Sequence, residues 1–162
     1  MHFPFYKAAR GKSAPQATIG ESNVMLRELI RIYGEKLSNV TTHIKAAVFF
    51  REDLPGVSAL FTSLSRAEAG ALHSLGTLLQ NIQIPTLPQN GILPPERESM
   101  ADSACAHLQL LSGAYRTQAE HYRRVARLAR TDKTKEVLSH LETEAIAHAE
   151  VLLSMHARLC RS

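Results

Sequence analysis

The segment from residue 134 to residue 159 constrains the fold most strongly, because its apolar side chains recur at intervals of three and four. This spacing lines one face of an α-helix that would be about 39 Å long. One ionisable residue, His148, interrupts the face near its middle. The apolar positions are Val137, Leu138, Leu141, Ala145, Ala149, Leu152, Met155 and Leu159.

The segment 57–83 shows the same period, and here Glu68 interrupts the apolar face near the middle. The segment predicts a second long amphipathic helix with a carboxylate at mid-depth. Its apolar positions are Val57, Leu60, Phe61, Leu64, Ala71, Leu72, Leu75, Leu78 and Leu79.

Two more helices are predicted from the same spacing. One begins after Glu21 or Ser22 and stops by Leu54, because Pro55 disfavours helix in the residue before it. Its expected inward face is Leu26, Leu29, Ile30, Tyr33, Leu37, Val40, Ile44, Ala47 and Val48. The other covers 99–130, with an expected inward face of Ala104, Leu108, Leu111, Tyr115, Gln118, Tyr122, Val125 and Ala129. After it, Asp132 or Thr134 could cap the helix of residues 134–159.

The only long connection is the Pro-rich linker 84–97, which also contains an Asn-Gly step. Extended, it reaches roughly 40 Å, the length of a helix of the bundle, so the helices before and after it can run parallel. The chain is therefore expected to be all-α, a ferritin-like four-helix bundle of two helical hairpins joined by a long crossover. Residues 1–20 are expected to be an irregular tail, and 21–162 a single domain.

Composition agrees with a helical globular protein: hydrophobic residues make up 44% and charged residues 21% of the chain. No apolar run approaches the roughly 18 residues of a membrane span, and the N-terminus lacks the apolar core of a signal peptide. We therefore expect a cytoplasmic protein with reduced thiols. In the last hairpin, Cys105 and Cys160 should differ in height by only about 4–5 Å. We predict two free thiols at one end of the bundle, with no catalytic role.

The two hairpins look like weak copies of each other. A shift of 77 residues places Glu68 on Ala145 and Ala71 on His148. Each half thus retains one member of a Glu-x-x-His pair. In di-iron carboxylate bundles such a pair aims two ligands from one helix at a shared metal centre.

On these residues the chain resembles the rubrerythrin-like, ferritin-like proteins, particularly bacterial members with an aromatic and Pro-rich N-terminus. The runs that carry the resemblance are 68–76 and 144–150. The resemblance implies a di-iron site with six ligands, of which only Glu68 and His148 remain here. The other four positions hold Asn39, Ala71, Tyr115 and Ala145. The fold is expected to persist, and the family's redox chemistry is not.

Glu68 and His148 are expected to form a buried pair in which each is the partner of the other. Tyr115 should lie at the same level, with its hydroxyl able to donate to Glu68. The alternative is one divalent metal, iron or another, bound at low occupancy by Glu68 and His148. Glu144 is a possible third ligand, although its place at the edge of the face suggests solvent. No other cofactor is expected.

The remaining histidines show no paired zinc-ligand spacing, so they are expected to lie mostly at the surface. They include His43, His73, His107, His121, His140 and His156. An outer face of the third helix carries Arg116, Arg123, Arg127 and Arg130, and is expected to be solvated. The net charge of +4 permits weak attraction to nucleic acid but does not require it. Nucleic acid is not the expected partner, because no aromatic residues interleave with these arginines and no recognition motif appears.

The leading functional hypothesis is a non-enzymatic binding or assembly module with a degenerate metal centre, expected to form a homodimer with no membrane association. The second is a divergent metal-dependent oxidoreductase or iron-handling protein that uses Glu68 and His148. The third is a basic DNA-associated bundle, which would bind DNA with a steep salt dependence.

Overall fold

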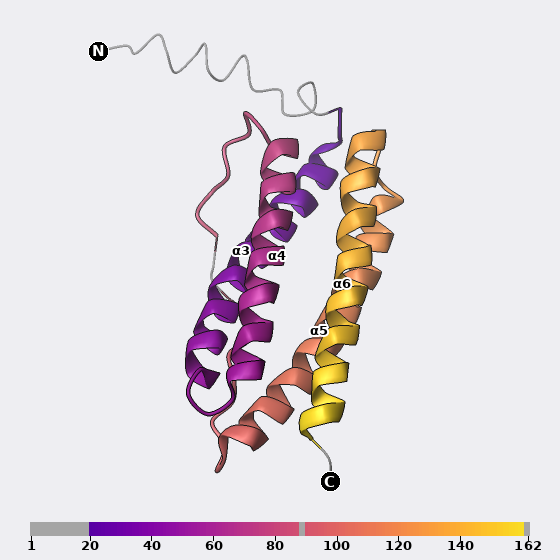
Figure 1. Ribbon diagram of the computed structural model, residues 1–162. Helices are drawn as coiled ribbons and strands as arrows, with labels where there is room; N and C mark the ends of the chain where they lie inside the picture. The colour runs from indigo at the N-terminus through magenta and orange to yellow at the C-terminus, as the bar shows by residue number, and fades with distance from the viewer. Residues whose placement is uncertain (1–19, 88–89, 161–162) are drawn as a thin grey trace, which may run out of the picture.

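The computed structural model describes residues 20–87 and 90–160, and over these ranges the chain forms four α-helices and no strand (Figure 1). Helix α3 spans Asn23–Phe50 and α4 spans Pro55–Leu78. Helix α5 spans Met100–Ala126 and α6 spans Asp132–Leu159. The prediction of an all-α four-helix bundle built from two hairpins is confirmed. The expected irregular tail lies outside the described residues, apart from Gly20.

The hairpins α3–α4 and α5–α6 lie side by side, with α3 against α5 and α4 against α6. The crossover returns along α3 before α5 begins, so α4 and α5 run parallel, as the Pro-rich linker predicts (Figure 1). The crossover packs closely on α3. A side chain in place of Gly91 would collide with Thr42, and a Cβ on Gly34 would lie 2.9 Å from Leu87 Cδ1.

Helix α4 ends at Leu78, five residues before the expected end of the helix. The reason is Asn81, whose φ of 70° is left-handed and cannot continue the helix. At the other end, Pro55 occupies the first helical turn, where its missing N–H costs nothing.

Helix α5 ends at Ala126 rather than at residue 130, and the buried carboxylate of Glu21 explains the turn that follows. This carboxylate accepts hydrogen bonds from the backbone N–H of Arg130 at 2.7 Å and of Thr131 at 3.0 Å. The cap of α6 is Thr131, whose Oγ1 accepts from the N–H of Thr134 at 3.2 Å, so the expectation of Asp132 or Thr134 as cap is wrong.

The apolar faces predicted for 57–83 and 134–159 form the core, but the face predicted for α3 is wrong in its second half. Ile44 and Val48 are 51% and 59% exposed, whereas Lys36 and His43 point inward and are buried. The helix carries two adjacent rows at three-and-four spacing, and the bundle buries the row that contains the polar residues. Inside the bundle, Lys36 is hydrogen-bonded to Glu68 and His43 to Tyr115.

The prediction of two free thiols is wrong. Cys105 and Cys160 form a disulfide with their Cα atoms 5.9 Å apart, and the described residues contain no free cysteine. The estimate that the two residues lie at similar heights, at the open end of the α5–α6 hairpin, agrees with this position. The physical error was the assumption of reduced thiols.

Candidate functional site

The centre of the bundle holds a carboxylate, that of Glu68 on α4, which is 0% exposed. Lys36 of α3 places its Nζ 3.1 Å from both carboxylate oxygens, and its side chain is 1% exposed. Asn39, one turn further along α3, donates from Nδ2 to Oε2 at 2.6 Å. Both oxygens of Glu68 are therefore hydrogen-bonded, and its negative charge is matched by a buried cation.

Two tyrosines of α5 complete the surroundings of the ammonium group. Lys36 Nζ lies 5.8 Å from the ring centroid of Tyr115 and 5.2 Å from that of Tyr122. Aromatic faces attract a cation at this range, the more so where water is excluded. Burial raises the pKa of both phenols, and the negative charge of Glu68 raises them further, so the rings stay neutral.

His148 of α6 reaches the same carboxylate only loosely. Its Nε2 lies 3.7 Å from Glu68 Oε1, too far for a hydrogen bond, and has no other partner within the described residues. Burial lowers the pKa of His148, and the charge of Lys36 lowers it further against the opposing pull of Glu68 and Glu144. The imidazole is therefore neutral near pH 7, and Glu68 is paired with Lys36 rather than with His148.

Tyr115 lies at the level of His148, with its ring edge-on to the imidazole and the centroids 5.1 Å apart. Its hydroxyl does not bond to Glu68 as expected. It pairs instead with His43 Nε2 of α3 at 2.6 Å. Glu68, Tyr115 and His148 thus lie in one region of the core, each with a different nearest partner.

His43 and His107 correct the expectation of surface histidines, because both are buried. His107 of α5 packs 5.2 Å from the ring of Phe61, and neither of its nitrogens has a partner in the described structure. Burial lowers its pKa to about 4. Burial is the main cause that lowers the pKa of His43 to about 3, and the charge of Lys36 acts in the same direction. Both rings are neutral members of an aromatic core.

Glu144 lies at the rim of the cluster. Its Oε1 is 3.2 Å from His140 Nε2 on the preceding turn of α6, and its Oε2 is buried without a partner among the described residues. The Glu144 side chain is 28% exposed, so the expectation that its edge position faces solvent is only partly right.

Lys36 and His43 are the site residues that the sequence reasoning missed. A signal for them was present, because they continue the spacing of core residues on both sides of the polar stretch. That row is Leu29, Ile32, Lys36, Asn39, His43, Ala46 and Phe50. The sequence analysis assigned the more apolar of the two adjacent rows to the core, whereas the structure buries the other row.

The residues at the centre do not fit the di-metal site that the family resemblance implies. A divalent cation would have to displace a buried ammonium from both oxygens of the one central carboxylate. Over residues 20–87 and 90–160, no three His, Cys, Asp or Glu side chains converge as a metal-binding group.

Elsewhere on the surface, Arg123 of the basic α5 face is paired with Glu142 at 2.7 Å. In the described part of the chain, no helix is both long and apolar enough to cross a bilayer.

Comparison of the chain with family models, curated proteins and solved structures gives no match in any of the three.

Proposed function

We propose that this chain is a ferritin-like bundle in which a lysine side chain occupies the place of the metal centre, and that it acts as a non-enzymatic binding or assembly module. The order of the helices supports the first part. Two antiparallel hairpins joined by one long crossover are the arrangement of ferritin-like folds.

One observation carries the proposal: Lys36 Nζ lies 3.1 Å from both oxygens of Glu68. In a metal-binding bundle the central carboxylate needs a cation to offset its burial. Here the chain supplies that cation covalently, on a side chain that cannot dissociate. A metal ion bound at Glu68 would gain one carboxylate ligand and would leave the Lys36 ammonium buried without a partner. Breaking a buried ion pair in this way costs about 3–5 kcal/mol.

The test is the metal content of the protein purified without chelator from iron-supplemented cells, measured beside Glu68→Gln. We expect both proteins to contain far less than one metal ion per chain, and calorimetric titration with Co²⁺ to show no saturable heat. Stoichiometric iron that Glu68→Gln loses would overturn the proposal and favour the oxidoreductase or iron-handling alternative.

The homodimer stays a prediction, which sedimentation of the purified chain tests. Cytoplasmic localisation is likewise untested. The disulfide weighs against it, because disulfides persist in oxidising compartments.

A further inference from the structure

The outer side of α3 exposes three large apolar side chains within two turns of its C-terminal end. Ile44 and Val48 form part of the row that sequence periodicity assigns to the core, and Phe49 is 40% exposed. Ile44 and Val48 are one helical turn apart and therefore lie on the same side of α3. Apolar side chains gathered on one exposed side are typical of an interaction site. Helix α3 is thus apolar on two sides, and the bundle buries only one of them.

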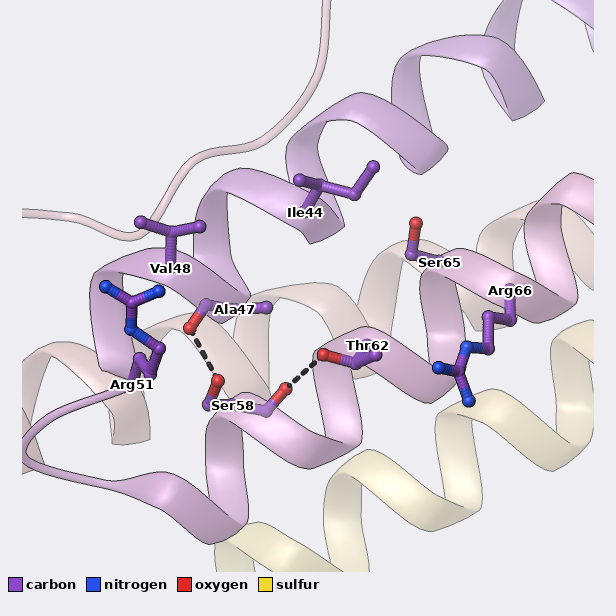
Figure 2. A pocket seen from close by; sticks show the side chains of 8 residues that line it. All are labelled: Ile44, Ala47, Val48, Arg51, Ser58, Thr62, Ser65 and Arg66. Carbon is purple, nitrogen blue, oxygen red and sulfur yellow. Dashed lines mark hydrogen bonds between the residues drawn. The ribbon is translucent and has the colours of Figure 1, made fainter.

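Beside this patch, α3 and α4 enclose a groove of about 410 Å³ (Figure 2). Ile44 and Val48 stand on its α3 side, and its floor is made of small residues. Two of these are serines whose hydroxyls are already used. Ser58 Oγ donates to the carbonyl of Ala47 at 2.6 Å, and Ser65 Oγ donates to that of Val40 at 3.1 Å. The floor therefore offers little polar competition to an apolar side chain.

The charges of the groove all have one sign. Arg51 at the end of α3 and Arg66 on α4 are its only charged lining residues, and they stand at opposite ends of the view in Figure 2. Neither guanidinium forms an ion pair with a described residue, in contrast to Arg31 and Arg123. Glu52 and Asp53 lie in the turn nearby but do not line the groove.

We propose that this groove docks an amphipathic, acidic helix of a partner protein. Apolar side chains of the partner would pack on Ile44 and Val48, and carboxylates at each end would pair with Arg51 and Arg66. The two carboxylates should therefore lie toward opposite ends of the partner helix's contact face, as Arg51 and Arg66 do in the groove.

Two other occupants are disfavoured by charge. Two copies of this chain meeting groove to groove about a twofold axis would bring the two arginines of one groove close to the two arginines of the other, and like charges repel in such an interface. The chain's own N-terminal segment is basic, with Lys7, Arg10 and Lys12, and lacks the complementary charge.

The inference rests on the proposed role as a binding module, but not on the proposed state of the core. Metal analysis tests the core, whereas a binding selection tests the groove. The probe is a displayed library of amphipathic helices with a fixed apolar face and randomised charged positions, selected on the full chain. We expect the enriched helices to be acidic, with carboxylates toward both ends of the contact face, and to lose at least about tenfold in affinity for Val48→Asp.

Two variants make the result specific. The Arg66→Glu variant should bind the acidic helices more weakly than the wild type does. It should bind versions of these helices in which Lys replaces the carboxylate residues. Val151→Asp places the same substitution on exposed α6, outside the groove, and should change nothing. All three positions face solvent, so thermal unfolding should confirm folded protein in each case.

The proposal would be overturned if the selection enriched basic or neutral helices, or if the Val48→Asp variant bound the enriched helices as well as the wild type does. So would a dimer of the wild type that Val48→Asp abolishes in sedimentation, because the groove would then belong to a second copy. None of these outcomes would alter the metal content, so failure of the groove and failure of the core proposal can be told apart.

Discussion

At the scale of single residues, the core of this bundle is organised by one ion pair. Glu68 is fully buried, and Lys36 and Asn39 together satisfy both of its oxygens. A buried pair of this kind contributes little net stability compared with apolar packing, yet breaking it by removing one partner is costly. We infer that the pair acts mainly by selecting which faces of α3 and α4 meet, since its net contribution to stability is small.

Replacing Lys36 by Met should destabilise the protein by about 3–5 kcal/mol, because Glu68 is left buried and unpaired. The double variant Lys36→Met/Glu68→Leu should lose clearly less than the single variant. Urea unfolding measures both. Arg123→Met is the control, since its exposed pair with Glu142 should be worth less than about 1 kcal/mol. Equal losses in the single and double variants would contradict the pairing.

The buried histidines predict how stability depends on pH. The folded-state pKa of His107, about 4, is below its unfolded value of 6.5, so the unfolded state binds the proton first. Stability should therefore be intact above pH 6.5 and fall as the pH drops toward 4, by up to about 1.4 kcal/mol per pH unit for this group. His107→Leu should flatten the slope between pH 6.5 and 4.5, and His73→Leu, at an exposed position, should not. Urea unfolding at several pH values provides the measurement.

At the scale of the helices, the sequence predicts most of the fold but not the composition of its centre. The apolar spacing of 57–83 and 134–159 identifies their buried faces because each carries a single row. The first helix carries two rows, and the choice between them depends on partners from α4 and α5, which spacing within one helix cannot reveal. Glu68 could be predicted as buried. Its partner Lys36 could not, because a lysine is rarely buried unless a distant residue pairs with it.

Glu21 shows how a contact distant in sequence fixes the end of a helix. Its carboxylate accepts from the backbone of Arg130 and Thr131, and thereby ties the start of α3 to the turn between α5 and α6. Burial would raise its pKa, but these hydrogen bonds outweigh burial and lower it. The resulting stability is present above the unfolded pKa of 4.5 and is lost as the pH falls through the lower folded value.

Glu21→Gln should therefore destabilise the protein at pH 7 by about 1–3 kcal/mol, the worth of hydrogen bonds to a charged group. The variant should also lose part of the pH dependence below pH 4.5. Thermal unfolding at pH 7 and at pH 3.5 checks both effects. Glu28→Gln, which removes a partly exposed pair with Arg31, is the matched control. A variant as stable as the wild type at pH 7 would show that the turn holds without Glu21.

At the scale of the whole molecule, the parts differ in how they are held together. The crossover packs along α3, Glu21 links the two hairpins at one end, and the disulfide closes the α5–α6 hairpin at the other. Near the C-terminal end of α3, Ile44 and Val48 stay exposed among the described residues. A preformed groove that is lined by apolar side chains and two arginines suits a docking module, because less order is lost when a partner binds a preformed surface.

The disulfide gives the last prediction. Cys105 and Cys160 are separated by 55 residues, and cross-linking a loop of that length is expected to stabilise by about 4 kcal/mol at most in the chain-entropy model. The double variant Cys105→Ser/Cys160→Ser should unfold at lower urea concentration, and wild type in reductant should match it. Because the bridge fastens the end of α6 to the start of α5, hydrogen exchange should increase first in the last turns of α6. Intact mass measured after thiol alkylation of the unfolded, unreduced protein decides whether the bridge forms. No added label agrees with the disulfide, and two labels per chain would restore the expectation of free thiols and a reducing compartment.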